Sequence, residues 1–194
     1  ELSRVVLAVK AILAEGEAGI GKSTLCQHLA LAWSTQKCSK NCVGPCVHSF
    51  GILVYLTVSD LKGFRSLSDA VHAHLISEEQ ITKESVIEVL QQSNTLFILD
   101  GLDEGHSDNP VFESLIKGQV MKTSRVLVTS RPSYARGLLH HFHLLLSVEG
   151  FNLKEKQEYV ERFAQDKNIP IERFAVIFKN EYIQIISSTP LTMN

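Results

Sequence analysis

The sequence has no apolar run long enough to cross a lipid bilayer. A membrane-spanning helix needs about 18 or more consecutive apolar residues, and the longest candidate, Val5 to Ala14, is interrupted by Lys10. The chain opens on Glu1 and lacks the charged start, apolar middle and small-residue cleavage site of a signal peptide. We therefore expect no membrane span and a cytoplasmic location, and we interpret the chain as an excerpt from a longer protein.

The sequence also lacks a tail of one charge sign. Its 19 basic and 21 acidic residues give a formal net charge of −2, so charge provides no reason to expect a nucleic-acid partner. Internal repeats and low-complexity segments are absent. With 44% hydrophobic and 21% charged residues among 194, the composition is typical of a globular protein with one α/β domain and the start of a second.

Cysteine is scarce, and three of the four cysteines lie in one short segment: Cys26 stands apart from Cys38, Cys42 and Cys46. Without a secretory signal, reduced thiols are the simpler interpretation. Together with His48, the segment has the spacing C-x3-C-x3-C-x-H, which supplies four ligands for one zinc ion. That spacing departs from the usual C-x2-C pairs, so a loop of thiols without zinc stays the alternative.

A second group of residues with metal-binding chemistry is the histidine cluster His140, His141 and His143. In an extended chain, alternation would place His141 and His143 on one face. A metal or catalytic role is one interpretation, and a hydrated loop is the other.

Strand-like and helix-like segments alternate along the first 150 residues, which predicts a parallel sheet flanked by helices. The strands are short apolar runs, and the helices show apolar residues at helical spacing. The predicted strands are Ala11–Glu15, Gly51–Val58, Thr95–Leu99, Arg125–Thr129 and Leu144–Val148, and the predicted helices are Lys22–Ser34, Ser66–Leu75, Lys83–Gln92 and Pro110–Met121.

The pattern changes after Gly150, where charged amphipathic segments replace the strands. Leu153–Phe163 and Ile171–Ser187 both have helical spacing. We therefore predict a core domain over residues 1–150 and the beginning of a helical subdomain, truncated, over residues 151–194.

The most specific local pattern is G-x-x-x-x-G-K-[ST], between a predicted strand and a predicted helix. Glycines let the backbone approach a ligand closely, successive N–H groups form an anion-binding nest, and the helix start adds its positive dipole end. The lysine charge suits β- and γ-phosphates, and the following hydroxyl suits magnesium. The residues are Gly16, Glu17, Ala18, Gly19, Ile20, Gly21, Lys22, Ser23 and Thr24.

A carboxylate follows the apolar strand Thr95–Leu99. Asp100 should emerge at the C-terminal edge of the sheet, where open α/β sheets bind ligands. Magnesium prefers oxygen ligands, so Ser23 and Asp100 are the predicted magnesium residues. An acidic surface loop is the alternative interpretation of this segment.

Two more acids and one arginine complete the predicted site. Asp103 and Glu104 could polarise a water for attack on the γ-phosphate, and spacing leaves open which acid is nearer to it. Arg131 follows the strand Arg125–Thr129. If that strand is adjacent to the Asp100 strand, Arg131 reaches the same edge and can sense the γ-phosphate; otherwise it is a surface arginine before a turn.

Together these segments resemble the NACHT domain of NOD-like receptors, a branch of the STAND group of P-loop NTPases. The resemblance is carried by GEAGIGKST (residues 16–24), LFILDGLDE (residues 96–104) and VLVTSRP (residues 126–132). It also includes Gly101 directly after Asp100 and the Thr189-Pro190-Leu191 segment, which is similar to a proline-bearing motif that contacts the nucleotide base.

The resemblance implies more than the residues alone. It implies ADP binding in a closed resting state, and exchange for ATP that permits self-oligomerisation in innate-immune signalling, with an adaptor recruited through an effector domain outside this chain. It implies phosphate and metal binding by Lys22, Ser23 and Thr24, hydrolysis by Asp103 and Glu104, sensing by Arg131, and adenine contact by Pro190. The chain departs from the family by ending before the winged-helix region.

Three other functions compete with a slow ATPase switch. The first is a nucleotide-binding assembly scaffold with negligible hydrolysis, which the acids Asp103 and Glu104 disfavour. The second is a P-loop kinase, which usually carries an arginine-rich lid, whereas Arg131 and Arg136 are isolated. The third is GTP use, for which the sequence has no Asn-Lys-x-Asp segment.

Overall fold

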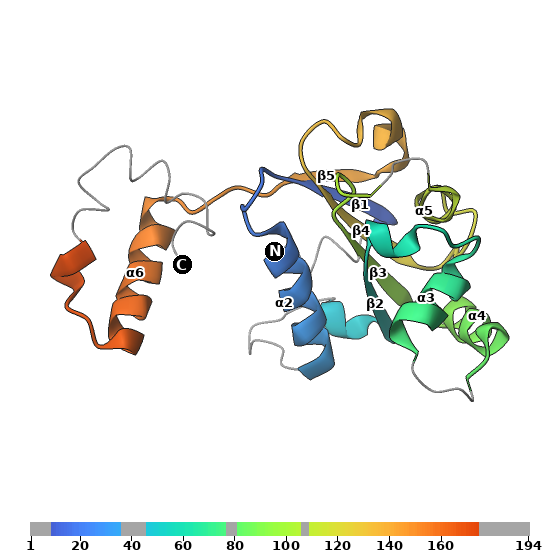
Figure 1. Ribbon diagram of the computed structural model, residues 1–194, viewed down its shortest axis with the longest axis horizontal. Coiled ribbons are helices and arrows are strands. Elements are labelled where there is room, and N and C mark those ends of the chain that lie inside the picture. Colours follow the sequence, from blue (N-terminus) through green and yellow to red (C-terminus); the bar gives the residue numbers. More distant parts are fainter. Residues whose placement is uncertain (1–8, 36–45, 77–80, 106–108, 175–194) are drawn as a thin grey trace. The chain divides into compact units, whose positions relative to one another are not determined.

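The computed structural model describes residues 9–35, 46–76, 81–105 and 109–174 (Figure 1). The chain forms two compact units, one of Glu1–Glu15 with Lys22–Ser147 and one of Gly16–Gly21 with Val148–Asn194. The predicted division into domains at residue 150 stays a prediction. None of the helices in the described ranges is long and apolar enough to span a bilayer.

A five-stranded sheet forms the centre of the first unit. Every neighbouring pair is parallel, and the order is β2-β3-β4-β1-β5. The predicted parallel α/β fold is thus confirmed. The strands are β1 (Ala11–Glu15), β2 (Ile52–Thr57), β3 (Thr95–Asp100), β4 (Arg125–Ser130) and β5 (Leu144–Ser147).

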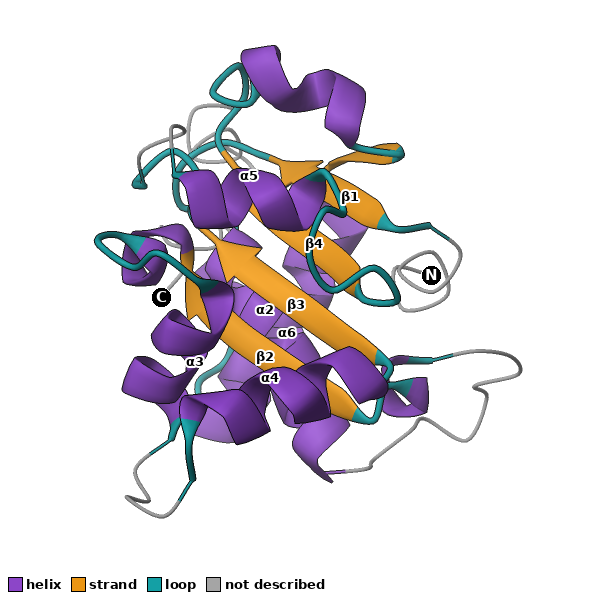
Figure 2. Cartoon of the chain, turned by 90° about the vertical axis from the view of Figure 1, so that its right-hand side faces the viewer, coloured by secondary structure: helices purple, strands orange, loops and turns teal. Residues whose placement is uncertain are grey.

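Helices cover both faces of this sheet. Helix α2 (Lys22–Thr35) lies on one face and contacts β2, β3 and β4. On the opposite face lie α3 (Leu67–Leu75), α4 (Lys83–Gln92) and α5 (Pro110–Ile116) (Figure 1; Figure 2). The short 3-10 helices are η1 (Val47–Ser49), η2 (Val58–Leu61) and η3 (Arg136–His141).

The apolar strands are buried because helices cover both faces. All six residues of β3 are buried, and Phe97, Leu99 and Phe112 are among the fully enclosed side chains of the core. A strand that is covered on both faces has a continuous apolar sequence rather than an alternating one. Asp100 is the one charged residue of this strand, and a buried carboxylate needs polar partners.

One helix is shorter than its sequence predicts. The predicted helix Pro110–Met121 is wrong at its C-terminal end, because α5 stops at Ile116. Gly118 follows in the left-handed region with φ of 66°, and the Gln119 N–H donates to the Ser114 carbonyl at 2.9 Å. A left-handed glycine just past the last helical turn is a common stop signal.

Within the residues that the structure describes, the second unit has one α-helix, α6 (Leu153–Lys167). It extends beyond the predicted end at Phe163, and it begins at a capping box in which Asn152 and Glu155 bond each other's backbone. It ends at Asn168, in the left-handed conformation with φ of 53°. The predicted helix Ile171–Ser187 begins as the 3-10 helix η4 (Ile171–Phe174), and its remainder lies outside the described residues.

Candidate functional site

The loop between β1 and α2 has a backbone that requires glycine. Gly19 and Gly21 adopt φ values of 73° and 102°, which residues with a Cβ rarely adopt. Between them, the Ile20 N–H donates to the Glu17 carbonyl at 3.3 Å and closes a turn. The glycines predicted from the motif thus stand where the backbone needs them.

The first glycine of the loop is needed for space rather than for φ. A Cβ on Gly16 would lie 2.8 Å from Ile20 Cγ2 and 2.8 Å from the Val148 carbonyl oxygen. Contacts that short force neighbouring atoms to move. Any larger residue at position 16 would therefore distort the loop.

The first turn of α2 contains Lys22, Ser23 and Thr24. Ser23 and Thr24 are exposed, Lys22 is partly exposed, and this turn contains no acidic residue. The N-terminal end of a helix carries a partial positive charge and N–H groups without helical partners. This end of α2 therefore suits an anionic ligand.

Asp100 closes β3 with only 7% of its surface exposed. Its Oδ1 accepts a hydrogen bond from the Thr129 hydroxyl, and the Cys26 thiol lies 4.0 Å from the same oxygen. Its Oδ2 lies 3.4 Å from the Tyr55 hydroxyl, which donates to it. The carboxylate is thus held by side chains from β2, β4 and α2.

The neighbours of Asp100 keep their protons at neutral pH. Burial, followed by the Asp100 charge, raises the pKa of Cys26 from 9.0 to about 12. Burial, followed by the Asp100 charge, raises the pKa of Tyr55 from 10.0 to about 12. Both groups therefore act as hydrogen donors toward the carboxylate.

Cys26 links the carboxylate to the helix start. It is fully buried, and it lies three residues after Ser23 on α2. Residues three apart on a helix are neighbours on its surface, and Asp100 approaches α2 at Cys26, about one turn after Ser23. The two residues predicted to serve magnesium therefore come from adjacent elements, and their role as ligands stays a prediction.

Arg131 and Asp103 form an ion pair at the same edge of the sheet. Strands β3 and β4 are adjacent, as the prediction for Arg131 requires. Arg131 Nε lies 2.8 Å from Asp103 Oδ2, and the Arg131 backbone N–H donates to Asp103 Oδ1 at 3.0 Å. The Asp103 side chain is only 5% exposed. Both of its carboxylate oxygens are engaged by Arg131.

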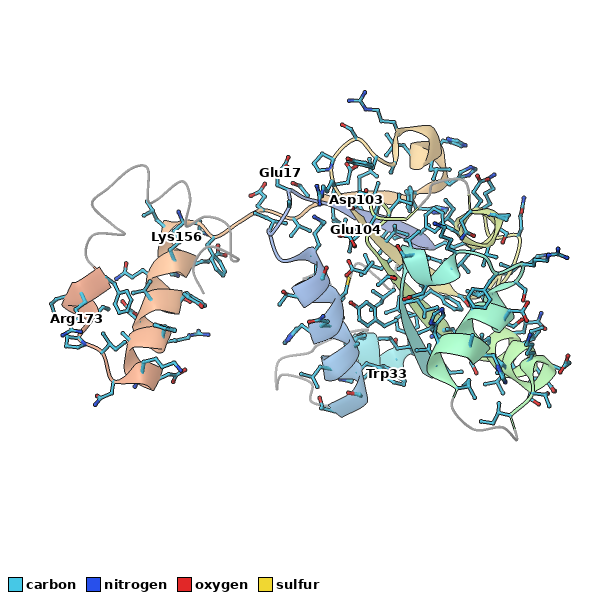
Figure 3. The ribbon with its side chains drawn as sticks, viewed as in Figure 1. Glu17, Trp33, Asp103, Glu104, Lys156 and Arg173 are labelled. Carbon is cyan, nitrogen blue, oxygen red and sulfur yellow. The ribbon has the colours of Figure 1, made fainter. Side chains whose placement is uncertain are left out.

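Glu104 occupies a different environment in the same turn. The N–H groups of Glu104 and Gly105 both donate to the Gly101 carbonyl, at 3.0 and 3.1 Å. Glu104 itself is exposed, and it lies beside Asp103 (Figure 3). Gly101, with φ of 76°, supplies the backbone conformation that starts this turn.

The comparisons with known proteins agree with this architecture. A model of the NACHT domain family matches residues 10–167. The chain belongs to the NACHT domain family. Its fold is that of a P-loop NTPase, which binds nucleotides through the loop between its first strand and helix.

Two curated relatives illustrate the match. The NACHT chain is 26% identical over 181 residues to baculoviral IAP repeat-containing protein 1 of Homo sapiens, covering 91% of this chain and 12% of that protein. It is 28% identical over 187 residues to NLR family CARD domain-containing protein 4 of Bos taurus, covering 91% of this chain and 17% of that protein. The chain thus spans a small part of either relative.

A solved structure shares the fold. The crystal structure of a DNA replication initiation factor matches with a TM-score of 0.53 and 14% identity, over 94% of this chain and 57% of that one. At this identity, the likeness concerns the fold alone.

Sequence reasoning missed two side chains that hold Asp100 in the NACHT domain, Thr129 and Tyr55. Thr129 also accepts from the Gly101 N–H at 2.9 Å, and its carbonyl accepts from the Leu102 N–H at 2.9 Å. Thr129 therefore orients the end of β3 as well as the carboxylate. The signal that reveals it is the β3–β4 pairing, which no local pattern contains.

We expect Thr129→Val to destabilise the domain by about 1–3 kcal/mol, because the buried Asp100 and the Gly101 N–H each lose a partner while the β-branched shape is kept. Urea denaturation measures the change. Magnesium-dependent nucleotide affinity should fall as well. Thr129→Ser, which keeps the hydroxyl, is the matched control, and a valine variant as stable as the parent would contradict the assignment.

The other predicted clusters of the NACHT domain are only partly described. Cys38 and Cys42 lie outside the described residues, as does Pro190. Cys46 Sγ lies 3.1 Å from His48 Nδ1, and His48 Nε2 lies 2.8 Å from the Ala32 carbonyl. Within the described ranges, no group of three or more metal-binding side chains is present, and the zinc hypothesis stays untested.

The histidine cluster begins in a 3-10 helix and not in the extended chain that the alternation argument assumes. His140 and His141 belong to η3, and their ring centroids lie 3.8 Å apart. Partial burial, then the neighbouring His140 and Lys117, lowers the pKa of His141.

Trp33, near the end of α2, donates from Nε1 to the Phe50 carbonyl at 2.9 Å (Figure 3).

Proposed function

We propose that this NACHT domain is a molecular switch that binds ADP or ATP with magnesium and hydrolyses ATP slowly. The observation that carries the proposal is the placement of Asp100 against α2, the helix that the glycine loop enters. A phosphate-binding helix start beside a buried carboxylate is what a magnesium–nucleotide complex requires.

The residues present fit a nucleotide. The loop of residues 16–21 and the first turn of α2 each offer backbone N–H groups, and Gly19 and Gly21 have the positive φ values that an anion-binding nest uses. Lys22 would neutralise the β- and γ-phosphates, and Thr24 would donate to the α-phosphate region. In this proposal the adenine contact is assigned to Pro190.

Ser23 and Asp100 fit a hard cation by their chemistry, since both present oxygen atoms. A bound magnesium ion would neutralise phosphate charge. Asp100 would hold the ion's water shell while Thr129 and Tyr55 keep its carboxylate oriented. Cys26 stays protonated and adds no competing charge.

Hydrolysis would use the acids of the turn after β3. Asp103 and Glu104 are the acids assigned to the attacking water, and Arg131 is assigned to sensing the γ-phosphate. Slow turnover fits a switch, because hydrolysis then resets the bound state rather than making a product.

The experiment that tests the proposal is identification of the nucleotide that copurifies with the full-length protein. Denatured protein is analysed by liquid chromatography with mass spectrometry, and adenine nucleotide near one equivalent is expected. Guanine nucleotide would overturn the ATP assignment. A protein without nucleotide that also fails to bind added ATP or ADP would overturn the proposal.

An assembly scaffold with negligible hydrolysis is a second candidate, favoured by one observation. Both oxygens of Asp103 are engaged by Arg131, which removes one acid from work on water. Phosphate release by the intact protein is compared with release by an Asp103→Asn, Glu104→Gln double variant. Equal rates would leave only the scaffold.

At the level of the whole protein, we propose a cytoplasmic receptor of innate-immune signalling that self-oligomerises through this domain and recruits an adaptor through its effector domain. The support is the NACHT family match and the relative named as an NLR family protein. Light scattering of the full-length protein with ADP and with a non-hydrolysable ATP analogue tests it. Larger assemblies are expected only with the analogue, and equal mass in both would contradict the proposal.

A further inference from the structure

The two neighbouring acids after β3 differ in what surrounds them. Asp103 is nearly enclosed, with a side chain 5% exposed, whereas Glu104 is exposed. Two acids that shared one task at a water molecule would both need access to it. Their environments therefore point to separate tasks.

Asp103 is committed to Arg131 through two contacts. Oδ2 pairs with Nε at 2.8 Å, and Oδ1 accepts from the Arg131 backbone N–H at 3.0 Å. The hydrogen bond from the Arg131 N–H to Oδ1 fixes the main chain just after β4. The ion pair between Nε and Oδ2 fixes the direction of the Arg131 side chain. Charge-assisted hydrogen bonds of this kind are stronger than neutral ones, and enclosure limits screening by water.

The geometry leaves Arg131 able to act on a ligand. The pairing uses Nε, and a guanidinium has two further nitrogens that this pairing does not involve. The side chain is 45% exposed. A guanidinium held at one edge and exposed elsewhere is preorganised, and preorganisation lowers the entropy lost when a ligand binds.

From these contacts we infer that Asp103 is a positioning residue that holds Arg131 for recognition of a nucleoside triphosphate. Asp103 acts through Arg131 and sets the preference for triphosphate over diphosphate. The inference rests on the proposed function, because it needs a nucleotide at this edge of the sheet. It assigns the contact with water to Glu104 alone.

The test compares affinities for ADP and for a non-hydrolysable ATP analogue, each with magnesium, by calorimetry on nucleotide-free full-length protein. Asp103→Asn keeps the size of the side chain and removes its charge. We expect the preference for the triphosphate to fall roughly tenfold, as expected for a weakened charged hydrogen bond, and to fall as far in Arg131→Ala. A purely structural role for Asp103 would weaken both ligands alike and leave the preference unchanged.

A double variant supplies the decisive comparison. If Asp103 acts only through Arg131, Asp103→Asn in the Arg131→Ala background causes no further loss of preference. Glu84→Gln, which removes a charge from an exposed position in the first turn of α4, is the matched control and should keep the preference. Additive losses in the double variant, or a stronger preference in Asp103→Asn alone, would overturn the inference.

The same measurements separate this inference from the proposed function. If the parent protein binds neither nucleotide, the proposed function has failed. If the parent binds both, Lys22→Ala binds neither, and Asp103→Asn keeps the parent preference, only the role of Asp103 has failed.

Discussion

Replacing Lys22 with alanine is expected to abolish nucleotide binding by the NACHT domain at ordinary ligand concentrations. Lys22 is the first residue of α2 and carries the full positive charge of the phosphate loop. Hydrogen bonds to charged groups are worth about 1.5–3 kcal/mol, so losing even one weakens binding roughly ten- to a hundredfold. Under the proposed function, several phosphate oxygens would depend on this one ammonium group, so its loss is expected to have one of the largest effects.

A thermal-shift assay measures the loss. Ligand at about 100 times its Kd stabilises a protein by about 2.7 kcal/mol, which raises Tm by about 5–10 °C for a domain of this size. The parent should show that rise with ATP and magnesium, and Lys22→Ala should not. Lys154→Ala, at an exposed position of α6, is the matched control and should keep the full shift. An unchanged shift in Lys22→Ala would overturn the assignment of the loop.

Replacing Glu104 with glutamine is expected to remove most of the ATP hydrolysis and to leave ATP binding intact. Glu104 is the exposed acid of the turn after β3, while its neighbour Asp103 is engaged by Arg131. Loss of a general base lowers turnover by about 10²–10⁴-fold. Glutamine keeps the size and hydrogen-bonding capacity of the side chain, so the binding site itself is retained.

Phosphate release under single-turnover conditions, with ATP affinity measured in parallel, checks this expectation. Glu84→Gln, an exposed glutamate in the first turn of α4, is the control for the lost charge and should hydrolyse ATP at the parent rate. If Glu104→Gln retains the parent rate while the parent shows real turnover, Glu104 is not the base, and the hydrolytic assignment returns to Asp103.

The acids at the C-terminal end of β3 differ in burial, and this difference suits them to different functions. Asp100 is surrounded by donors from Thr129, Tyr55 and Cys26. Asp103 is neutralised by Arg131. The exposed Glu104 alone among the three acids has an environment suited to contact with a mobile water.

The parts of the site that are contiguous in the sequence could be predicted from it. The loop of residues 16–24 carries Gly19 and Gly21 where φ is positive, and the run before Asp100 is apolar because helices cover both faces of β3. Local backbone preferences and burial leave local patterns, so the strands, the parallel sheet and the NACHT resemblance could all be predicted from the residues. The end of α5 could not be predicted from the apolar spacing, because α5 stops at Ile116, before the left-handed Gly118.

The contacts that assign work to each residue needed the tertiary structure. The order β2-β3-β4-β1-β5 inserts β4 between β1 and β3, and that insertion brings Thr129 to Asp100 and Arg131 to Asp103. Partners 28 or 29 residues apart leave no periodic trace in the sequence. Residue types and local geometry were therefore determined by the sequence itself, whereas the pairing of strands decided which acid is enclosed and which remains exposed to water.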